Sequence, residues 1–201
     1  MAVTLWNDYI CPWAYAARPL TGWLRAQGVR VEVRAFELHP DLPPEGRRVR
    51  PGGRLDAVFD HIAAECAATG LEFAKPARSP NTHRLLGVTE LVAAHHPSAF
   101  DAVDDGLARL HWVDGGALDD ADAVDAILAG AGVDAGELRR READGEGETL
   151  LEAAMALAAE AEVTGTPAWR IGPMTITGLH PPAQFQRWAE RLLERNPDAA
   201  H

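Results

Sequence analysis

The order strand, helix, strand within the first 36 residues most constrains what this chain can fold into. Residues 2–7 predict a short strand, and residues 29–36 alternate apolar with charged side chains, the pattern of a half-buried strand. Between them, residues 13–27 carry apolar side chains at helical spacing and end before Gly28, a common helix terminator. Such a unit pairs its strands in parallel through a right-handed crossover. The chain is therefore predicted to form an α/β fold.

The segment between the first strand and the helix places a thiol where the helix starts. Pro12 suits the first helical position, so Cys11 is expected at the helix N-terminus. The unpaired N–H groups and the positive end of the helix dipole there favour a thiolate, which predicts a pKa below the ordinary value of about 8.5. Cys11 is therefore the candidate catalytic residue. Pro19, inside the helix, predicts a bend rather than a break.

Composition indicates an acidic globular protein. Hydrophobic residues make up 47% of the 201 residues, enough for one buried core. The net charge of −11 argues against a nucleic-acid partner. No signal-peptide pattern opens the sequence, and no apolar run approaches the roughly 18 residues of a membrane span, so we expect a cytoplasmic protein without a membrane partner. The two cysteines, Cys11 and Cys66, and the scattered histidines predict neither a disulfide framework nor a metal site.

A long loop and a helical region follow the first two strands. Residues 38–53 are rich in proline and glycine, and four arginines occur in or just after them, at positions 47, 48, 50 and 54. We interpret these arginines as part of a solvated loop; the alternative is a site for an acidic ligand or partner. Apolar residues at helical spacing then predict helices at 55–69, 81–95, 98–113, 120–129, 134–142 and 148–162.

The C-terminal part returns to strands. Residues 163–172 predict a turn that leads into a strand, and a second strand at 175–177 follows the tight Gly172-Pro173 turn. The pair should form an antiparallel hairpin. Pro181 begins a last helix that runs through Leu193. We divide the chain into a first sheet-forming part at 1–53, an inserted helical domain at 54–147 and a second sheet-forming part at 148–201.

Separated motifs resemble those of the DsbA family of thioredoxin-fold oxidoreductases. Residues 11–15 (CPWAY) resemble the CPWC-Tyr motif of its FrnE-like branch, residues 163–167 (VTGTP) its cis-proline loop, and residues 177–181 (TGLHP) its closing Gly-x-x-Pro turn. Residues 81–85 (NTHRL) resemble the start of that branch's helical domain. The resemblance covers nearly the whole chain. It implies a thioredoxin fold with a helical domain inserted after the second strand.

The main departure from the family is Ala14, which stands where the second cysteine of the CxxC motif belongs. A dithiol enzyme expels its product with that second thiol, so Cys11 alone would need an external thiol such as glutathione. Cys66 lies on an apolar helical stripe and is interpreted as a small buried hydrophobe. Pro167 is either a tight-turn proline or, as the resemblance to the cis-proline loop implies, a cis-proline that packs against Cys11, and we favour the second. The backbone of Thr166 would then be free to pair with an extended peptide or with glutathione.

Further candidate contacts come from the same motifs. Trp13 is interpreted as a core residue, with contact to a substrate as the alternative. His83 and Arg84 are interpreted as helix-surface residues, but in the resembled family this helix packs over the cleft. The candidate substrate- or glutathione-binding residues are Pro12, Trp13, Ala14, His83, Arg84, Thr166 and Pro167.

Three functions remain open from the sequence. The first is a DsbA/FrnE-like thiol-disulfide oxidoreductase that acts on a thiol or disulfide substrate through Cys11, with glutathione as the external thiol. The second is a glutathione-dependent isomerase or kappa-type transferase acting on a small molecule, because 2-hydroxychromene-2-carboxylate isomerases and kappa glutathione transferases resemble this architecture and lack CxxC. Those enzymes usually carry serine at the position of Cys11, which favours the first function. The third is a non-catalytic protein that binds a peptide or partner. A homodimer is compatible with each.

Overall fold

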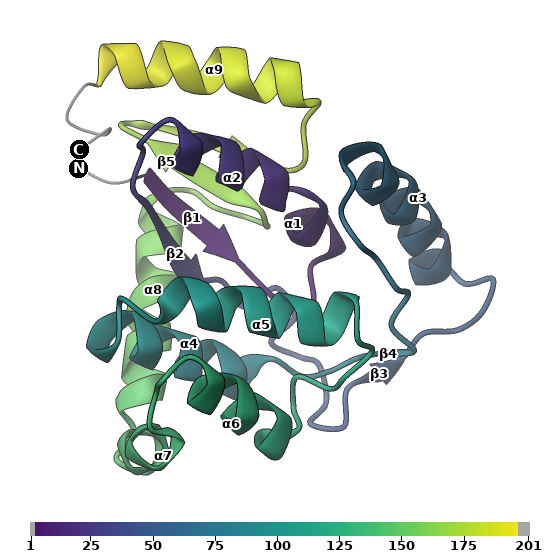
Figure 1. The fold of residues 1–201 in the computed structure, drawn as a ribbon, viewed down its shortest axis with the longest axis vertical. Helices are drawn as coiled ribbons and strands as arrows, with labels where there is room; N and C mark the ends of the chain where they lie inside the picture. Colours follow the sequence, from purple (N-terminus) through teal and green to yellow (C-terminus); the bar gives the residue numbers. More distant parts are fainter. Residues whose placement is uncertain (1–2, 197–201) are drawn as a thin grey trace.

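The computed structural model describes residues 3–196 and contains a four-stranded sheet with the order β2-β1-β5-β6. Strands β1 (Val3–Asn7) and β2 (Val31–Ala35) are parallel. Strand β5 (Ala168–Ile171) is antiparallel to β1, and β6 (Met174–Thr177) pairs with β5 as the predicted antiparallel hairpin. The architecture is the predicted thioredoxin-like α/β fold, with its helical region inserted between β2 and β5 (Figure 1).

The first helical segment is divided in two, α1 (Pro12–Ala16) and α2 (Arg18–Ala26), which meet at Ala17. The prediction of one bent helix is therefore wrong. Pro19 lies in the first turn of α2, where a backbone N–H would have no helical partner in any case. The chain accommodates Pro19 by starting a new helix, so no helical hydrogen bond is lost and the first helix does not bend.

The inserted region follows the predicted helices to within two residues at each end. Aspartate caps open two of them: Asp120 accepts hydrogen bonds from the N–H groups of Asp122 and Ala123, and Asp134 accepts one from Gly136. In the part of the chain from residue 3 to residue 196, no helix is both long and apolar enough to cross a membrane. The helices are α3 (Arg54–Thr69), α4 (His83–His95), α5 (Phe100–Trp112), α6 (Ala121–Gly130), α7 (Ala135–Ala143) and α8 (Glu146–Glu160).

A two-stranded ribbon was not predicted. Strand β3 (Arg47–Arg48) pairs antiparallel with β4 (Arg78–Ser79), on either side of α3 in the sequence. Strands of two residues are too short to show alternation, so the pattern of the sequence does not reveal them. The ribbon gives a defined backbone to part of the arginine-containing loop.

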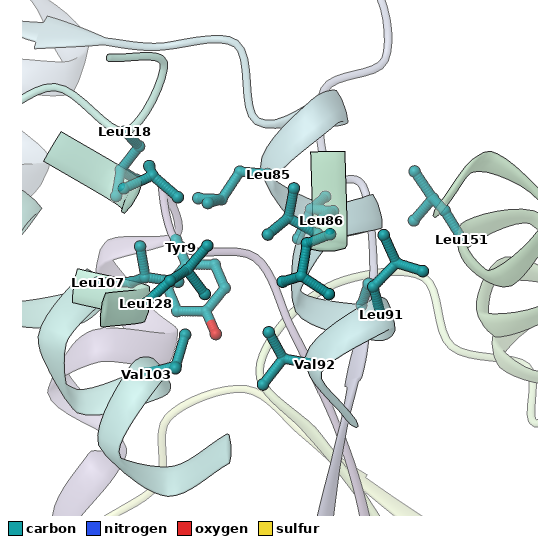
Figure 2. Packing of buried hydrophobic residues seen from close by; sticks show 14 of the residues in the cluster. Tyr9, Leu85, Leu86, Leu91, Val92, Val103, Leu107, Leu118, Leu128 and Leu151 are labelled. Atoms are coloured by element: carbon teal, nitrogen blue, oxygen red, sulfur yellow. The ribbon is translucent and has the colours of Figure 1, made fainter. Parts of the chain in front are cut away.

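Helices cover both faces of the sheet. Helices α2 and α9 (Pro182–Arg195) pack on the face that presents Leu5 and Trp169, and α8 packs on the face that presents Trp6 and Ala168. A separate core lies among the inserted helices. Figure 2 shows Tyr9 in that core among leucines and valines of the insert, although Tyr9 belongs to the loop that leads to Cys11. The loop that carries the candidate thiol is thus anchored in the helical region.

Candidate functional site

Cys11 is the N-cap residue of α1 and Pro12 is its first residue, as predicted. The Cys11 thiol donates a hydrogen bond of 3.2 Å to the backbone carbonyl oxygen of Thr166. The peptide bond between Thr166 and Pro167 is cis. The structure therefore brings together the candidates from the two ends of the chain, the thiol at the start of α1 and the loop that leads into β5.

Burial raises the pKa of the Cys11 thiol, which corrects the lowered pKa predicted from its helix position. The residue is only 2% exposed, and removal from water disfavours the charged thiolate. The N–H groups of Ala14 and Trp13 act in the opposite direction, but their effect is smaller. The carboxylate of Asp8 adds to the rise. Cys11 is therefore a protonated hydrogen-bond donor at neutral pH.

We expect the rate of Cys11 alkylation by iodoacetamide to rise with pH. The pH midpoint of this rise should be higher than that of free cysteine in the same buffer. Only the thiolate reacts, and its formation is delayed to higher pH by the raised pKa. The measurement uses Cys66→Ser protein, so that the remaining thiol gives the whole signal. A midpoint below that of free cysteine would show that the helix N-terminus outweighs burial.

Asp8 is a fully buried carboxylate in the loop before Cys11, and sequence reasoning gave it no role. It accepts hydrogen bonds from the Ile10 N–H at 3.3 Å, the Leu38 N–H at 2.9 Å and the Thr82 hydroxyl at 3.0 Å. These partners come from its own loop, from the segment after β2 and from the residue before α4. Burial raises the pKa of Asp8 to about 6. Asp8 therefore fixes the Cys11 loop to the segment after β2 and to the helical insert.

Ala14 lies beside two cavities. The larger, of about 340 Å³, lies between α2, the sheet and α5, and its lining includes Ala14, Arg18, Pro167 and Trp169. A small hollow lined by Cys11 also borders on Ala14 and Arg18. The guanidinium of Arg18 pairs at 2.8 Å with Asp104. The larger cavity has the size of a site for a small organic molecule.

Two other residues singled out in the sequence lie in α3 or against it: Cys66 belongs to α3, and Trp13 contacts it. Cys66 is fully buried against Phe59 and Trp112, and burial raises its pKa to about 11. Its interpretation as a small buried hydrophobe is confirmed, and Cys66 is not available as a second thiol. Trp13 is half-buried and contacts His61 of α3, with 5.4 Å between the ring centroids.

His83 and Arg84 lie at the start of α4 and are engaged by carboxylates. His83 contacts Glu37 through Nδ1 at 3.1 Å and Glu148 through Nε2 at 2.8 Å, and these partners raise its pKa. Arg84 pairs with Glu142 at 2.7 Å. Within the described residues, neither side chain lines either cavity beside Ala14. The structure thus separates these two candidates from the group around Cys11.

Comparisons with known proteins identify the fold. A sequence profile of the DSBA-like thioredoxin domain matches residues 2–188. The structure is similar to a probable DsbA oxidoreductase from Streptomyces coelicolor, with a TM-score of 0.84 and 24% identity over 96% of this chain and 90% of that chain. It is similar to a 2-hydroxychromene-2-carboxylate isomerase (TM-score 0.79, 18% identity, 98% of each chain). It is also similar to the cytosolic disulfide reductase DsbM from Pseudomonas aeruginosa with glutathione, with a TM-score of 0.67 and 16% identity over 96% of this chain and 100% of that chain. None of the curated proteins matches the sequence.

Proposed function

This chain belongs to the DSBA-like thioredoxin domain family, and we propose that it is a thiol-disulfide oxidoreductase that acts through Cys11 with glutathione as the external thiol. The observation that carries the proposal is the contact between the Cys11 thiol and the carbonyl of Thr166, beside the cis peptide bond to Pro167. Ala14 occupies the position of the second thiol on the same helix. The pairing of a thiol with this loop supports disulfide exchange, and the alanine limits the reaction to one protein thiol.

The proposed cycle reduces a mixed disulfide between a substrate and glutathione. The Cys11 thiolate attacks the glutathionyl sulfur, the substrate thiolate leaves and takes up a proton, and a disulfide forms between Cys11 and glutathione. A second glutathione, as thiolate, attacks that glutathionyl sulfur, which yields oxidised glutathione and restores Cys11. The reaction needs no resolving cysteine. It draws on a pool of reduced glutathione, so we propose a reducing compartment such as the cytoplasm.

The loop around Pro167 offers groups that fit glutathione. The Thr166 hydroxyl is buried and has no hydrogen-bond partner among residues 3–196. Leaving a buried hydroxyl unpaired costs about 1–3 kcal/mol, which a bound ligand would recover. The backbone of Thr166 is not free as predicted, because its carbonyl accepts the Cys11 thiol and the Pro167 carbonyl accepts the Gly178 N–H. Once Cys11 forms a disulfide with glutathione, the Thr166 carbonyl would be released to accept a backbone N–H of the cysteinyl part, as in a short added strand. DsbM, a structural relative, has been solved with glutathione.

Incubation with oxidised glutathione is expected to attach one glutathionyl group to Cys11, and reduced glutathione should remove it. Cys66 should stay unmodified because it packs inside the hydrophobic cluster with Phe59 and Trp112 and, unlike Cys11, lines neither cavity beside Ala14 in the described part of the chain. Intact-protein mass spectrometry and peptide mapping measure the adduct, and the Cys11→Ser variant serves as the control. A folded protein that gains no adduct at Cys11, even at alkaline pH, would contradict the proposed cycle.

The cavity of about 340 Å³ beside Ala14 and Pro167 favours one second candidate, a glutathione-dependent isomerase or transferase acting on a small molecule. In that reaction a protonated Cys11 would donate a hydrogen bond to the glutathione thiolate, a role that its raised pKa suits. Cys11→Ser separates the two candidates, since a serine hydroxyl still donates a hydrogen bond but cannot form a disulfide. Glutathione-dependent turnover of a small molecule that survives this substitution would favour the second candidate.

A further inference from the structure

We propose that the arginine segment, Arg47, Arg48, Arg50 and Arg54, is a docking surface for an acidic polypeptide stretch next to the disulfide that Cys11 attacks. The inference rests on the proposed function, because it names the class of substrate for that site. The four arginines occupy β3, the turn after it and the first residue of α3. They were interpreted from the sequence as a solvated loop, and three features of the structure argue for the alternative.

The first feature is the absence of internal partners. All four arginines are exposed, and within residues 3–196 none of them forms an ion pair. The neighbouring carboxylates of Asp56 and Asp60 are instead engaged by Lys75, at 2.9 and 2.7 Å. Four arginines against the single acidic residue Glu45 give residues 45–54 a net charge of +3 in a chain with a net charge of −11.

The second feature is that the local structure disfavours two of the four cations. Arg48 lies directly opposite Arg78 in the β3–β4 ribbon, and like charges at directly opposed positions destabilise a strand pair. Arg54 is the first residue of α3, where the helix dipole disfavours a positive charge. Arg78 has its own partner in Asp119. Because stability of the ribbon or helix does not explain Arg48 and Arg54, an external anion is the better explanation.

The third feature is a hydrophobic cluster that the segment shares with a residue of α1 close in sequence to the thiol. Val49 and Leu55, which adjoin the arginines, pack in the same hydrophobic cluster as Trp13, two residues beyond Cys11. Figure 1 shows α3 beside α1. Charges in this segment would act on a substrate over about a Debye length, roughly 10 Å at 0.1 M salt. Their spread over a ribbon, a turn and a helix end suits an extended acidic chain better than a single phosphate.

The test compares two five-residue peptides, with a central cysteine flanked by four glutamates or by four glutamines, each activated as a disulfide with 2-thiopyridine. The Cys11 thiolate attacks the peptide sulfur, a disulfide forms between Cys11 and the peptide, and the thiopyridine leaves and is measured. We expect the glutamate peptide to react about tenfold faster at low salt, with the difference lost at high salt. In parallel, fluorescence anisotropy measures binding of a labelled glutamate peptide that contains no cysteine.

Two triple variants with the same net charge provide the comparison. The first changes the arginine segment, and the second changes exposed arginines of α9, which lies on the other side of α2 from the inserted region (Figure 1). We expect the first to lose both the rate difference and the anisotropy signal, and the second to keep them. The variants are Arg48→Gln with Arg50→Gln and Arg54→Gln, and Arg187→Gln with Arg191→Gln and Arg195→Gln.

The outcomes separate the two proposals. Equal rates for the two peptides without specific binding of the labelled peptide would overturn the docking surface while leaving the oxidoreductase function intact. Equal losses in both triple variants would also overturn it, because net charge alone would then explain the preference. A third outcome is that Cys11 reacts with neither peptide, while the labelled peptide still binds and only the first variant loses binding. That outcome would support the docking surface and contradict the oxidoreductase function.

Discussion

The Ala14→Cys variant is expected to reduce insulin disulfides in the presence of dithiothreitol at least about tenfold faster than the parent protein, because a thiol held on the same helix acts at a high effective concentration. Positions 11 and 14 are three residues apart at the start of α1, and side chains at this spacing are neighbours on a helix. The introduced thiolate would attack the Cys11 sulfur of the mixed disulfide and release the substrate as a thiolate. Dithiothreitol would then reduce the internal disulfide.

The matched control for this gain is Ala16→Cys. Ala16 is also buried in α1, but it packs with Tyr15 and Phe59 in the cluster beneath α3. A thiol there adds a cysteine to the same helix without placing it beside Cys11, so the variant should stay at the level of the parent. An Ala14→Cys protein that folds normally, as judged by circular dichroism, yet shows no gain would count against a surviving oxidoreductase site.

The parts of the fold and site that could be predicted from the sequence are those encoded by local patterns. Alternation at residues 29–36 predicted a strand, the Gly172-Pro173 turn predicted the hairpin, and Asp120 and Asp134 predicted helix starts. Each signal depends on neighbouring residues, which are visible in one sequence. The motifs at Cys11 and Pro167 were likewise readable, and the structure places them in contact through Thr166.

The parts that could not be predicted depend on contacts between distant segments. The pKa of Cys11 was expected to fall because the helix start is a local feature, whereas its burial comes from the cis-proline loop and the inserted helices. Asp8 stands in the same short motif, but its partners Leu38 and Thr82 lie 30 and 74 residues away. The β3–β4 ribbon is similarly non-local. The ribbon places Arg48 opposite Arg78, an unfavourable pairing of like charges that composition alone does not reveal.

Trp112 connects the inserted helices to the loop of the candidate thiol, and Trp112→Ala is expected to lower the free energy of unfolding by about 4 kcal/mol. The side chain is 1% exposed and stacks on Tyr15 and Phe73, with centroid separations of 5.4 and 5.7 Å. For a protein of this size the loss corresponds to a fall in Tm of roughly 10 °C, measurable by calorimetry. Trp23→Ala is the control, because Trp23 is only half-buried and its loss should be smaller.

The more specific variant is Trp112→Phe, which keeps an aromatic ring in the stack but removes the indole N–H together with part of the ring volume. The indole N–H of Trp112 donates a 2.9 Å hydrogen bond to the carbonyl oxygen of Tyr9, two residues before Cys11. The unpaired carbonyl should cost about 1–2 kcal/mol, and the loop that buries the thiol should open more often. We therefore expect faster alkylation of Cys11 in Trp112→Phe at a pH where both proteins are folded. An unchanged alkylation rate alongside a lowered Tm would show that Trp112 stabilises the fold without restraining the Cys11 loop.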